Sequence, residues 1–156
     1  GRTFIAREQS EREELVKIKL SPIAPVVAGK RVVLIDDSIV RGTTSACIVK
    51  LLRNAGATEV HMRSSAPKFL YPCYFGTDID SQDNLIAWNH SDEEMRQMLD
   101  VDSLGFLSPE NVTKLSDNPA SGGYCTACFT GKYPCAVPQE RGKSKYSRRI
   151  GADGED

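Results

Sequence analysis

Hydrophobic and polar positions in the first half of the chain predict strands and helices in turn. Residues 31–35 form a continuous run of β-branched and aliphatic side chains after Arg31, which is typical of a strand buried on both faces of a parallel sheet. Residues 45–55 follow with helical spacing, and Gly56 predicts the end of that helix. Four residues share its apolar stripe: Ile48, Leu51, Leu52 and Ala55. Residues 59–63 predict the next strand, so this order predicts a βαβ unit with a right-handed crossover.

Capping and breaking residues predict further elements on either side. Residues 91–94 have the S-x-x-E pattern of a capping box and predict a helix that ends near Leu99. Residues 104–107 predict a short strand, and the Ser108-Pro109 pair predicts the start of a short helix. Before the first strand, helix-breaking residues follow a charged segment: Pro22, Pro25 and Gly29.

Composition and charge exclude several classes of protein. The chain has 156 residues, the size of one domain with a real core. Its 20 Lys and Arg balance 21 Asp and Glu, so we expect no nucleic-acid partner and no attraction to anionic membranes. No apolar run approaches the ~18 residues of a membrane span, and residues 1–5 are too short and polar for a secretory signal. We therefore expect a cytoplasmic protein.

Residues 36–44 combine acidic, hydroxyl and glycine residues between the first strand and the first helix. Asp36 and Asp37 come at the carboxyl end of the strand, where open α/β sheets bind ligands. A glycine-containing turn before a helix can direct backbone N–H groups at a phosphate, so Gly42, Thr43 and Thr44 are candidate phosphate contacts. Carboxylates cannot hold a phosphate, but they can accept from sugar hydroxyls or help to hold Mg²⁺. A plain helix-capping turn is the alternative interpretation.

Five cysteines also suggest chemistry. Cys125 and Cys128 form a Cys-x-x-Cys pair, which is compatible with an iron–sulfur cluster, with zinc or with a redox pair. Cys73 is a further candidate ligand, whereas Cys47 has the position of a core thiol and Cys135 has no place in the pattern. His61 and His90 are not spaced as a metal or catalytic pair.

The acidic strand end and its loop resemble the phosphoribosyl pyrophosphate (PRPP) motif of type I phosphoribosyltransferases. Across roughly residues 1–135 the chain is more specifically similar to glutamine PRPP amidotransferases. The stretches that carry this resemblance are 1–5 with Gln9, Arg12 and 16–20, then 36–45, 56–61, 71–73 and 125–134.

The resemblance implies a fold, an activity and a site. The fold is α/β and type I phosphoribosyltransferase-like, a mostly parallel sheet flanked by helices and incomplete on its N-terminal side. The activity is transfer of glutamine-derived ammonia to PRPP with release of pyrophosphate, the first committed step of purine synthesis. The implied PRPP site is Asp36, Asp37, Ser38, Ile39, Val40, Arg41, Gly42, Thr43 and Thr44, with Mg²⁺ near the two acids. Arg2 and Lys19 are candidate cationic groups for the leaving pyrophosphate, with ordinary surface charge as the alternative.

The same resemblance assigns the cysteines and the domain boundaries. Cys73, Cys125 and Cys128 match three ligands of a [4Fe–4S] cluster, whose fourth ligand is expected upstream of Gly1 together with a glutaminase domain. The expected division is residues 1–116 as the C-terminal part of the transferase domain, with 1–30 as its mobile loop region, 117–137 as a cysteine-containing segment and 138–156 as a disordered tail. The full enzyme is expected to be a homo-oligomer.

Two other functions are compatible with the loop. One is a PRPP-sensing regulator without catalysis, and the other is a type I phosphoribosyltransferase that uses a base such as orotate or hypoxanthine. The Cys73 and Cys125–Cys128 pattern argues against both, because neither function needs it.

Overall fold

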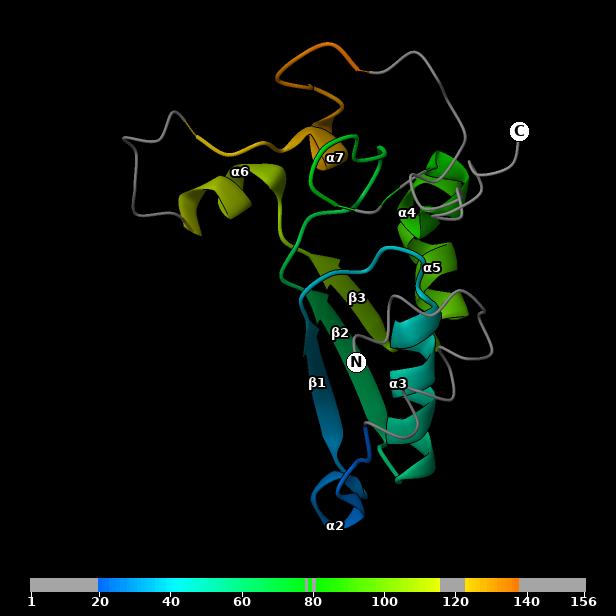
Figure 1. Ribbon diagram of the computed structural model, residues 1–156. Helices are drawn as coiled ribbons and strands as arrows, with labels where there is room; N and C mark the ends of the chain where they lie inside the picture. The colour runs from blue at the N-terminus through cyan, green and yellow to red at the C-terminus, as the bar shows by residue number, and fades with distance from the viewer. Residues whose placement is uncertain (1–19, 78, 80, 116–122, 138–156) are drawn as a thin grey trace, which may run out of the picture.

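Three parallel strands form the centre of the protein in the computed structural model, which describes residues 20–77, 79, 81–115 and 123–137. The strands are β1 (Arg31–Asp36), β2 (Glu59–Ser64) and β3 (Ser103–Phe106), in the order β1-β2-β3. Arg31 pairs with Glu59, and His61 with Ser103, in a parallel register. The predicted strand–helix–strand unit and the predicted α/β class with a parallel sheet are confirmed (Figure 1).

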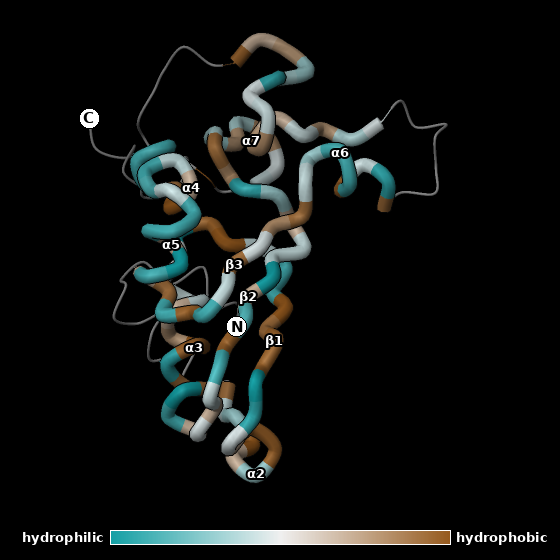
Figure 2. Tube along the Cα trace, turned by 180° about the vertical axis from the view of Figure 1, so that it is seen from behind, coloured by the Kyte–Doolittle hydropathy of each residue, from teal (hydrophilic) through white to brown (hydrophobic). Residues whose placement is uncertain are grey.

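Helices lie on one face of this sheet and beyond its ends (Figure 1). The helices that Figure 1 labels are α2 (Ala24–Val27), α3 (Thr43–Asn54), α4 (Ile86–Asn89), α5 (Asp92–Met98), α6 (Pro109–Val112) and α7 (Ala127–Thr130). Two single-turn 3₁₀ segments are Gln82–Asn84 and Thr113–Leu115. In Figures 1 and 2, α3, α4 and α5 lie on the same side of the strands, whereas α6 and α7 lie beyond the carboxyl ends.

Local sequence explains where these helices begin and end. The predicted capping box is present at α5: the Ser91 hydroxyl accepts from Glu94 N–H, and the Glu94 carboxylate accepts from Ser91 N–H. Ser108 caps α6 as predicted, with Pro109 in the first turn. Gly56 follows the end of α3 and has φ +91°. This left-handed backbone conformation is common just after a helix and favours glycine. Pro25 was expected to break a helix, but it lies in the first turn of α2. Proline is tolerated there because the N–H that it lacks would have no acceptor within the helix.

The main core lies between the sheet and α3 and α5. Its fully buried residues include Val49 of α3, Met62 of β2, and Met95 and Leu99 at α5. The α3 stripe differs from the prediction: Leu52 packs against this core, but the buried positions are Ser45 and Val49 rather than Ile48 and Leu51. Ser45 and Val49 are four residues apart and therefore share the buried face of α3.

The prediction that β1 is buried on both faces is wrong for the described part of the chain. Val33 is 61% and Ile35 is 72% exposed, whereas Leu34 packs against the main core. The physical reason is that the described helices cover only the face to which Leu34 points (Figures 1 and 2).

Candidate functional site

The phosphate loop, residues 36–44, joins the carboxyl end of β1 to the first turn of α3 (Figure 1). Gly42 occupies the N-cap of α3 with φ +80°. A Cβ at this position would lie 2.7 Å from Ile86 Cδ1 and 3.4 Å from Leu99 Cδ2. The backbone conformation and the close approach of the core therefore both require glycine here.

The start of α3 is electrostatically suited to an anion. A glycine N-cap has no side chain to accept from the first-turn N–H groups of this 12-residue helix. Those N–H groups carry the positive end of the helix dipole, and the Thr43 and Thr44 hydroxyls lie in the same turn. A phosphate at this turn would satisfy the donors and neutralise their partial charge.

Asp36 and Asp37 form a compact pair of carboxylates beside that turn. The Asp37 N–H donates to Asp36 Oδ1 at 3.0 Å, and the Ser38 hydroxyl donates to Asp37 Oδ1 at 2.9 Å. Burial raises the pKa of Asp36, and the charge of Asp37 adds to this, although hydrogen bonds from Asp37 N–H and Ser45 partly offset both effects. A cation or a set of hydroxyl donors at the pair would stabilise the charged form of Asp36.

Two of the predicted site residues have side chains that anchor the loop in apolar clusters. Ile39 is 1% exposed and belongs to the main core. Val40 packs against a second apolar cluster, and its carbonyl accepts from Ile86 N–H at 3.0 Å. Ile39 is buried and Val40 is partly buried, whereas Arg41 is exposed. The described structure thus keeps Asp36, Asp37, Ser38, Thr43 and Thr44 as side-chain candidates.

Ser65 supports the loop and was missed in the sequence. Its N–H and its hydroxyl both donate to the Asp36 carbonyl, at 2.9 and 3.0 Å, so the end of β2 holds the end of β1. The available signal was its position directly after a predicted parallel strand, at the edge where Asp36 and Asp37 also lie.

The cysteine region, residues 69–77 and 79 with 125–133, lies beyond the carboxyl ends of the strands. The N–H groups of Leu70 and Tyr71 donate to the Cys128 carbonyl at 2.9 and 3.0 Å, and the Phe69 and Phe129 rings meet edge to face at 4.9 Å. These contacts join α7 to the loop that carries Cys73, as Figure 1 shows. Cys73 and Cys128 thus pack against the same apolar cluster, whereas the convergence of the Cys73, Cys125 and Cys128 sulfurs on one site stays a prediction.

The pKa values of the two half-buried thiols in this region, Cys73 and Cys128, are shifted in opposite directions. Burial alone would raise the pKa of Cys73, but the backbone N–H groups of residues 75–77 outweigh it and the pKa is lowered. Thr77 N lies 3.3 Å from Cys73 Sγ. Burial raises the pKa of Cys128 to about 11, with further contributions from Cys73 and Cys125. Charge on Cys73 or Cys125 thus disfavours the thiolate form of Cys128.

The donor chemistry of these thiols suits iron–sulfur or zinc, because several sulfur ligands and N–H donors to sulfur surround one apolar region. However, no three His, Cys, Asp or Glu side chains of the described residues already form a group that could hold a metal ion. Cys125 is exposed, and so is Cys135, which the sequence left without a role. The ligand assignment of Cys73, Cys125 and Cys128 therefore stays a prediction.

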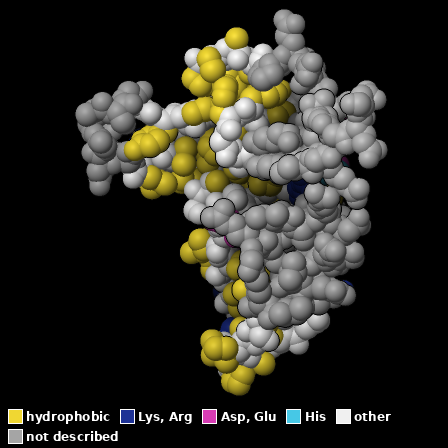
Figure 3. Space-filling view, viewed as in Figure 1, with side chains coloured by type: hydrophobic (Ala, Val, Ile, Leu, Met, Phe, Trp, Pro, Cys, Tyr) yellow, Lys and Arg dark blue, Asp and Glu magenta, His cyan; other side chains and the backbone are white. Residues whose placement is uncertain are grey.

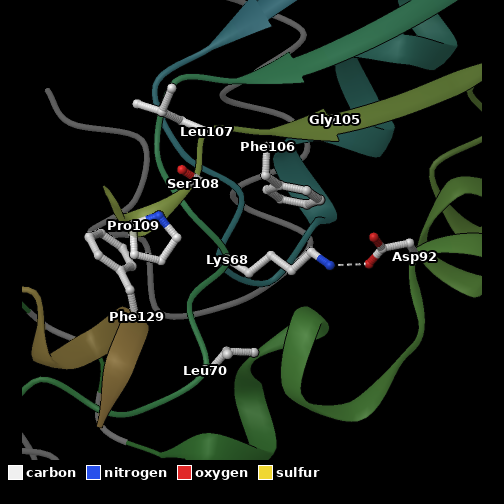
Figure 4. Close-up of a pocket in the computed structure, with 9 residues that line it drawn as sticks. All are labelled: Lys68, Leu70, Asp92, Gly105, Phe106, Leu107, Ser108, Pro109 and Phe129. Atoms are coloured by element: carbon white, nitrogen blue, oxygen red, sulfur yellow. Dashed lines mark hydrogen bonds and ion pairs between the residues drawn. The ribbon is translucent and has the colours of Figure 1, made fainter. Parts of the chain in front are cut away.

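A separate hollow of about 380 Å³ lies between β3, α6 and α7 (Figure 4). Lys68 points into it, forms an ion pair with Asp92 and lies 5.5 Å from the centroid of the Phe106 ring. Phe129 and Pro109 form the opposite side in this view. Because its one cation is already paired and none of the predicted site residues lines it, this hollow is not the candidate PRPP site.

Known proteins show clear similarity to the chain. It is 51% identical over 145 residues, 93% of its length, to the amidophosphoribosyltransferase of Synechococcus elongatus, and 51% identical over 141 residues to that of Methanocaldococcus jannaschii. A solved structure, the glutamine PRPP amidotransferase from B. subtilis complexed with ADP and GMP, matches 90% of the chain with a TM-score of 0.70 and 51% identity. No protein-family model matches the chain.

The chain is homologous to amidophosphoribosyltransferases. The resemblance and the type I phosphoribosyltransferase-like fold inferred from the sequence are thereby confirmed. The chain spans 29% of the Synechococcus amidophosphoribosyltransferase and 32% of the B. subtilis chain. The comparison therefore concerns a part of those enzymes.

Several other predictions fall outside the described residues. Arg2 and Lys19, the charged segment near the start and the tail 138–156 belong to this group. His61 lies on β2 and bonds to Ser103 and Glu59, and His90 follows α4. In the parts that the structure describes, no helix is long and apolar enough to cross a membrane.

Proposed function

We propose that the protein supplies the PRPP-binding part of an amidophosphoribosyltransferase, which transfers glutamine-derived ammonia to PRPP. The observation that carries this proposal is the phosphate loop: two adjacent carboxylates end β1, and a glycine-capped helix follows. The 51% identity to enzymes of this name supports the same substrate. The proposal includes a cytoplasmic location for the protein and a homo-oligomeric state for the full enzyme.

The loop has a separate task for each part of PRPP. The first-turn N–H groups of α3, with the Thr43 and Thr44 hydroxyls, bind the ribose 5-phosphate at the positive end of the helix. Asp36 and Asp37 accept hydrogen bonds from the ribose hydroxyls and orient the ring. Ser65 keeps the Asp36 backbone in place through its two hydrogen bonds.

The reaction exchanges one bond at C1 of the ribose. The C1–O bond breaks and its electron pair leaves with pyrophosphate, the ammonia nitrogen forms the new C1–N bond, and the nitrogen then loses a proton. C1 is cation-like between these events, so catalysis depends on holding the ribose and on stabilising the departing charge. In this proposal Arg2 and Lys19 supply part of that positive charge.

Two cofactors complete the proposal. Mg²⁺ bound near Asp36 and Asp37 would neutralise part of the negative charge of the pyrophosphate. Cys73, Cys125 and Cys128 would hold three corners of a structural [4Fe–4S] cluster, because soft thiols from two segments meet in one apolar region there.

The carboxylate pair provides the direct test. Replacing Asp36→Asn together with Asp37→Asn removes charged acceptors worth roughly 1.5–3 kcal/mol each, so we expect PRPP affinity to fall by at least tenfold. Titration calorimetry with PRPP and Mg²⁺ measures this, and circular dichroism checks that the variant is folded. Asp83→Asn with Asp100→Asn is the matched control, since both acids are exposed and outside the loop. Unchanged affinity in the loop variant would refute the assignment.

A further inference from the structure

The hollow between β3, α6 and α7 has the size and the place of a ligand site. Its volume of about 380 Å³ lies within the range of small-molecule sites, roughly 300–1,000 Å³. It adjoins the carboxyl end of β3, and ligands of open parallel sheets bind beyond the carboxyl ends of the strands. Figure 3 shows hydrophobic side chains gathered over α6 and α7, in the upper part of the view. The hollow is therefore a second candidate for a ligand, separate from the phosphate loop.

Most side chains that line the hollow are apolar. Phe106 at the end of β3, Phe129 of α7 and Leu70 line different sides of it in Figure 4. Phe129 is held from behind, because its ring meets the ring of Phe69 edge to face at 4.9 Å and Phe69 is itself buried. Pro109 continues the apolar lining beside Phe129. Aromatic walls of this kind suit an apolar group and favour a flat ring.

Two opposite charges stand at one end of the hollow (Figure 4). Lys68 follows β2 and Asp92 lies in the first turn of α5, and the two side chains form an ion pair. The side chains are 34% and 64% exposed, so water screens the pair, and a ligand that separates the two groups loses little. The Lys68 ammonium also lies 5.5 Å from the centroid of the Phe106 ring, which keeps this cation beside the apolar wall.

A zwitterion matches this arrangement better than a single charge does. A plain anion at Lys68 would lie next to the Asp92 carboxylate, and a plain cation at Asp92 would lie next to the Lys68 ammonium. A molecule with both charges replaces one exposed ion pair by two charge-assisted contacts. A free α-amino acid carries its carboxylate, its ammonium and its side chain on one carbon atom, so its apolar side chain can enter the hollow while both charges stay at the end.

We propose that the hollow binds a free α-amino acid with a large apolar side chain, for which L-phenylalanine is the probe. The carboxylate of the amino acid pairs with Lys68, and its ammonium pairs with Asp92. Its ring lies among Phe106, Phe129 and Leu70. This binding site shares no side chain with the candidate PRPP site, and the inference does not depend on the proposed function.

A bound amino acid links the hollow to the cysteine region. Its contacts join the segment after β2, the start of α5 and α7, which otherwise meet only at their edges around the hollow. Binding stabilises the arrangement in which all three elements are in place, so it suppresses the opening of α7. The amides of Leu70 and Tyr71 donate to the Cys128 carbonyl and report on this opening.

An NMR titration of the isotope-labelled 156-residue chain with L-phenylalanine tests the proposal. We expect saturable shifts at the amides of Gly105, Leu107 and Phe129, which line the hollow. Three analogues each lack one part of the ligand: L-alanine lacks the ring, phenylpropionate lacks the ammonium, and phenethylamine lacks the carboxylate. Each should bind at least tenfold more weakly than L-phenylalanine, because a site with groups placed for a ligand rejects an analogue that leaves them unpaired.

Two charge variants assign the contacts. Lys68→Met and Asp92→Asn should each weaken L-phenylalanine at least tenfold. Lys68→Met should leave the affinity for phenethylamine no weaker, since that analogue has no carboxylate to lose, and Asp92→Asn should leave the affinity for phenylpropionate no weaker. The matched controls are Lys50→Met and Asp83→Asn, two exposed residues that do not line the hollow, and they should bind L-phenylalanine as the unaltered chain does.

Hydrogen exchange tests the link to the cysteine region. At a concentration of L-phenylalanine ten times its dissociation constant, exchange at the Leu70 and Tyr71 amides should slow by about tenfold. Unchanged exchange at these amides in the saturated chain would show that the ligand does not hold α7.

The other outcomes overturn the proposal. Absence of saturable shifts in the folded chain would mean that the hollow binds no amino acid. Equal affinity for phenylpropionate and L-phenylalanine would remove Asp92 from the site, and full affinity in Lys68→Met would place the ligand elsewhere. If a variant does not fold, as circular dichroism shows, the three analogues give the same answer on the unaltered chain. The PRPP titration reports on the proposed function independently of these measurements.

Discussion

The phosphate loop and the cysteine region both lie beyond the carboxyl ends of the strands, yet they are built in different ways. The loop is one continuous stretch, and its ends are set by β1 and α3. The cysteine region combines Cys73 with Cys125 and Cys128 from a distant part of the sequence. Local sequence can therefore determine the loop, whereas the cysteine region depends on long-range packing.

The two regions also differ in how they are anchored. Ile39 ties the loop to the main core, and Ser65 ties it to β2. The cysteine region packs on the smaller cluster of Phe69, Ile79 and Leu85, and the Tyr133 hydroxyl donates to the Pro72 carbonyl at 2.8 Å. A region with fewer buried apolar neighbours opens at lower free energy, so we expect the cysteine region to open before the loop does.

The largest expected effect is on the loop side. Gly42→Ala should lower the free energy of unfolding by about 3 kcal/mol, because the positive φ costs roughly 1 kcal/mol and the contact with Ile86 adds overpacking. Urea unfolding measures the loss. Gly29→Ala is the matched control, with φ +71° and no heavy atom within 4 Å, and should cost only the strain of roughly 1 kcal/mol. Equal losses in the two variants would show that the core does not press on Gly42.

A matched pair of glycines makes the same test in the cysteine region. Gly131→Ala should cost about 2 kcal/mol, because its Cβ would lie 2.9 Å from the Tyr71 ring in addition to the strain of φ +74°. Gly123→Ala, with φ +93° and open space around it, should cost roughly half as much. We expect the extra loss to be local. Hydrogen exchange should therefore accelerate at the Leu70 and Tyr71 amides, which donate to Cys128, but not at the amides of β2.

Thiol reactivity gives the smallest and most specific test. The pKa of Cys128 is about 11 in place of 9.0, so at pH 8 its thiolate is roughly 100-fold rarer than that of an ordinary thiol. A thiolate with a higher pKa is also a stronger nucleophile, which offsets part of the loss in thiolate concentration. We therefore expect Cys128 to be alkylated about tenfold more slowly than an ordinary thiol. Cys73 should react faster than Cys128, since its pKa is lowered, and the rate at Cys128 should keep rising with pH toward 11.

Alkylation rates measured between pH 6 and pH 11 by peptide mass spectrometry check both thiols. The exposed Cys135 serves as the internal reference within the same protein. Similar profiles for Cys73 and Cys128 would contradict the opposite electrostatics of the two thiols and weaken the distinction between an N–H-rich and a buried sulfur site.

Much of the fold could be predicted because its signals are local. The aliphatic run of β1, the capping box at Ser91 and the Ser108-Pro109 start each depend on a few adjacent residues, and all three are present in the structure. The α3 stripe and the role of Pro25 were wrong in part. Helical spacing does not say which side of a helix meets the sheet, and a proline breaks or starts a helix according to what precedes it.

For the candidate site too, features that depend on adjacent residues could be predicted, whereas features that depend on tertiary contacts could not. Nine consecutive residues predicted the phosphate loop, but the sequence could not show that Ile39 and Val40 point into apolar clusters or that Ser65 holds the Asp36 carbonyl. These facts depend on where β2 and α4 lie against the loop. The similarity to known enzymes pointed to amidophosphoribosyltransferases, and the geometry then separated the side chains that anchor the loop from those that remain candidates for the site.

The sequence by itself determined the three strands, the order of strand, loop and helix around residues 36–44, and the composition of that loop, because acid, hydroxyl and glycine side chains stand next to one another there. Tertiary structure alone decided which face of β1 is buried, which thiols share a region and what pKa each thiol has. The physical reason is range: hydrogen bonds and dihedral preferences act between neighbours along the chain, whereas burial and charge act between residues that only the fold brings together.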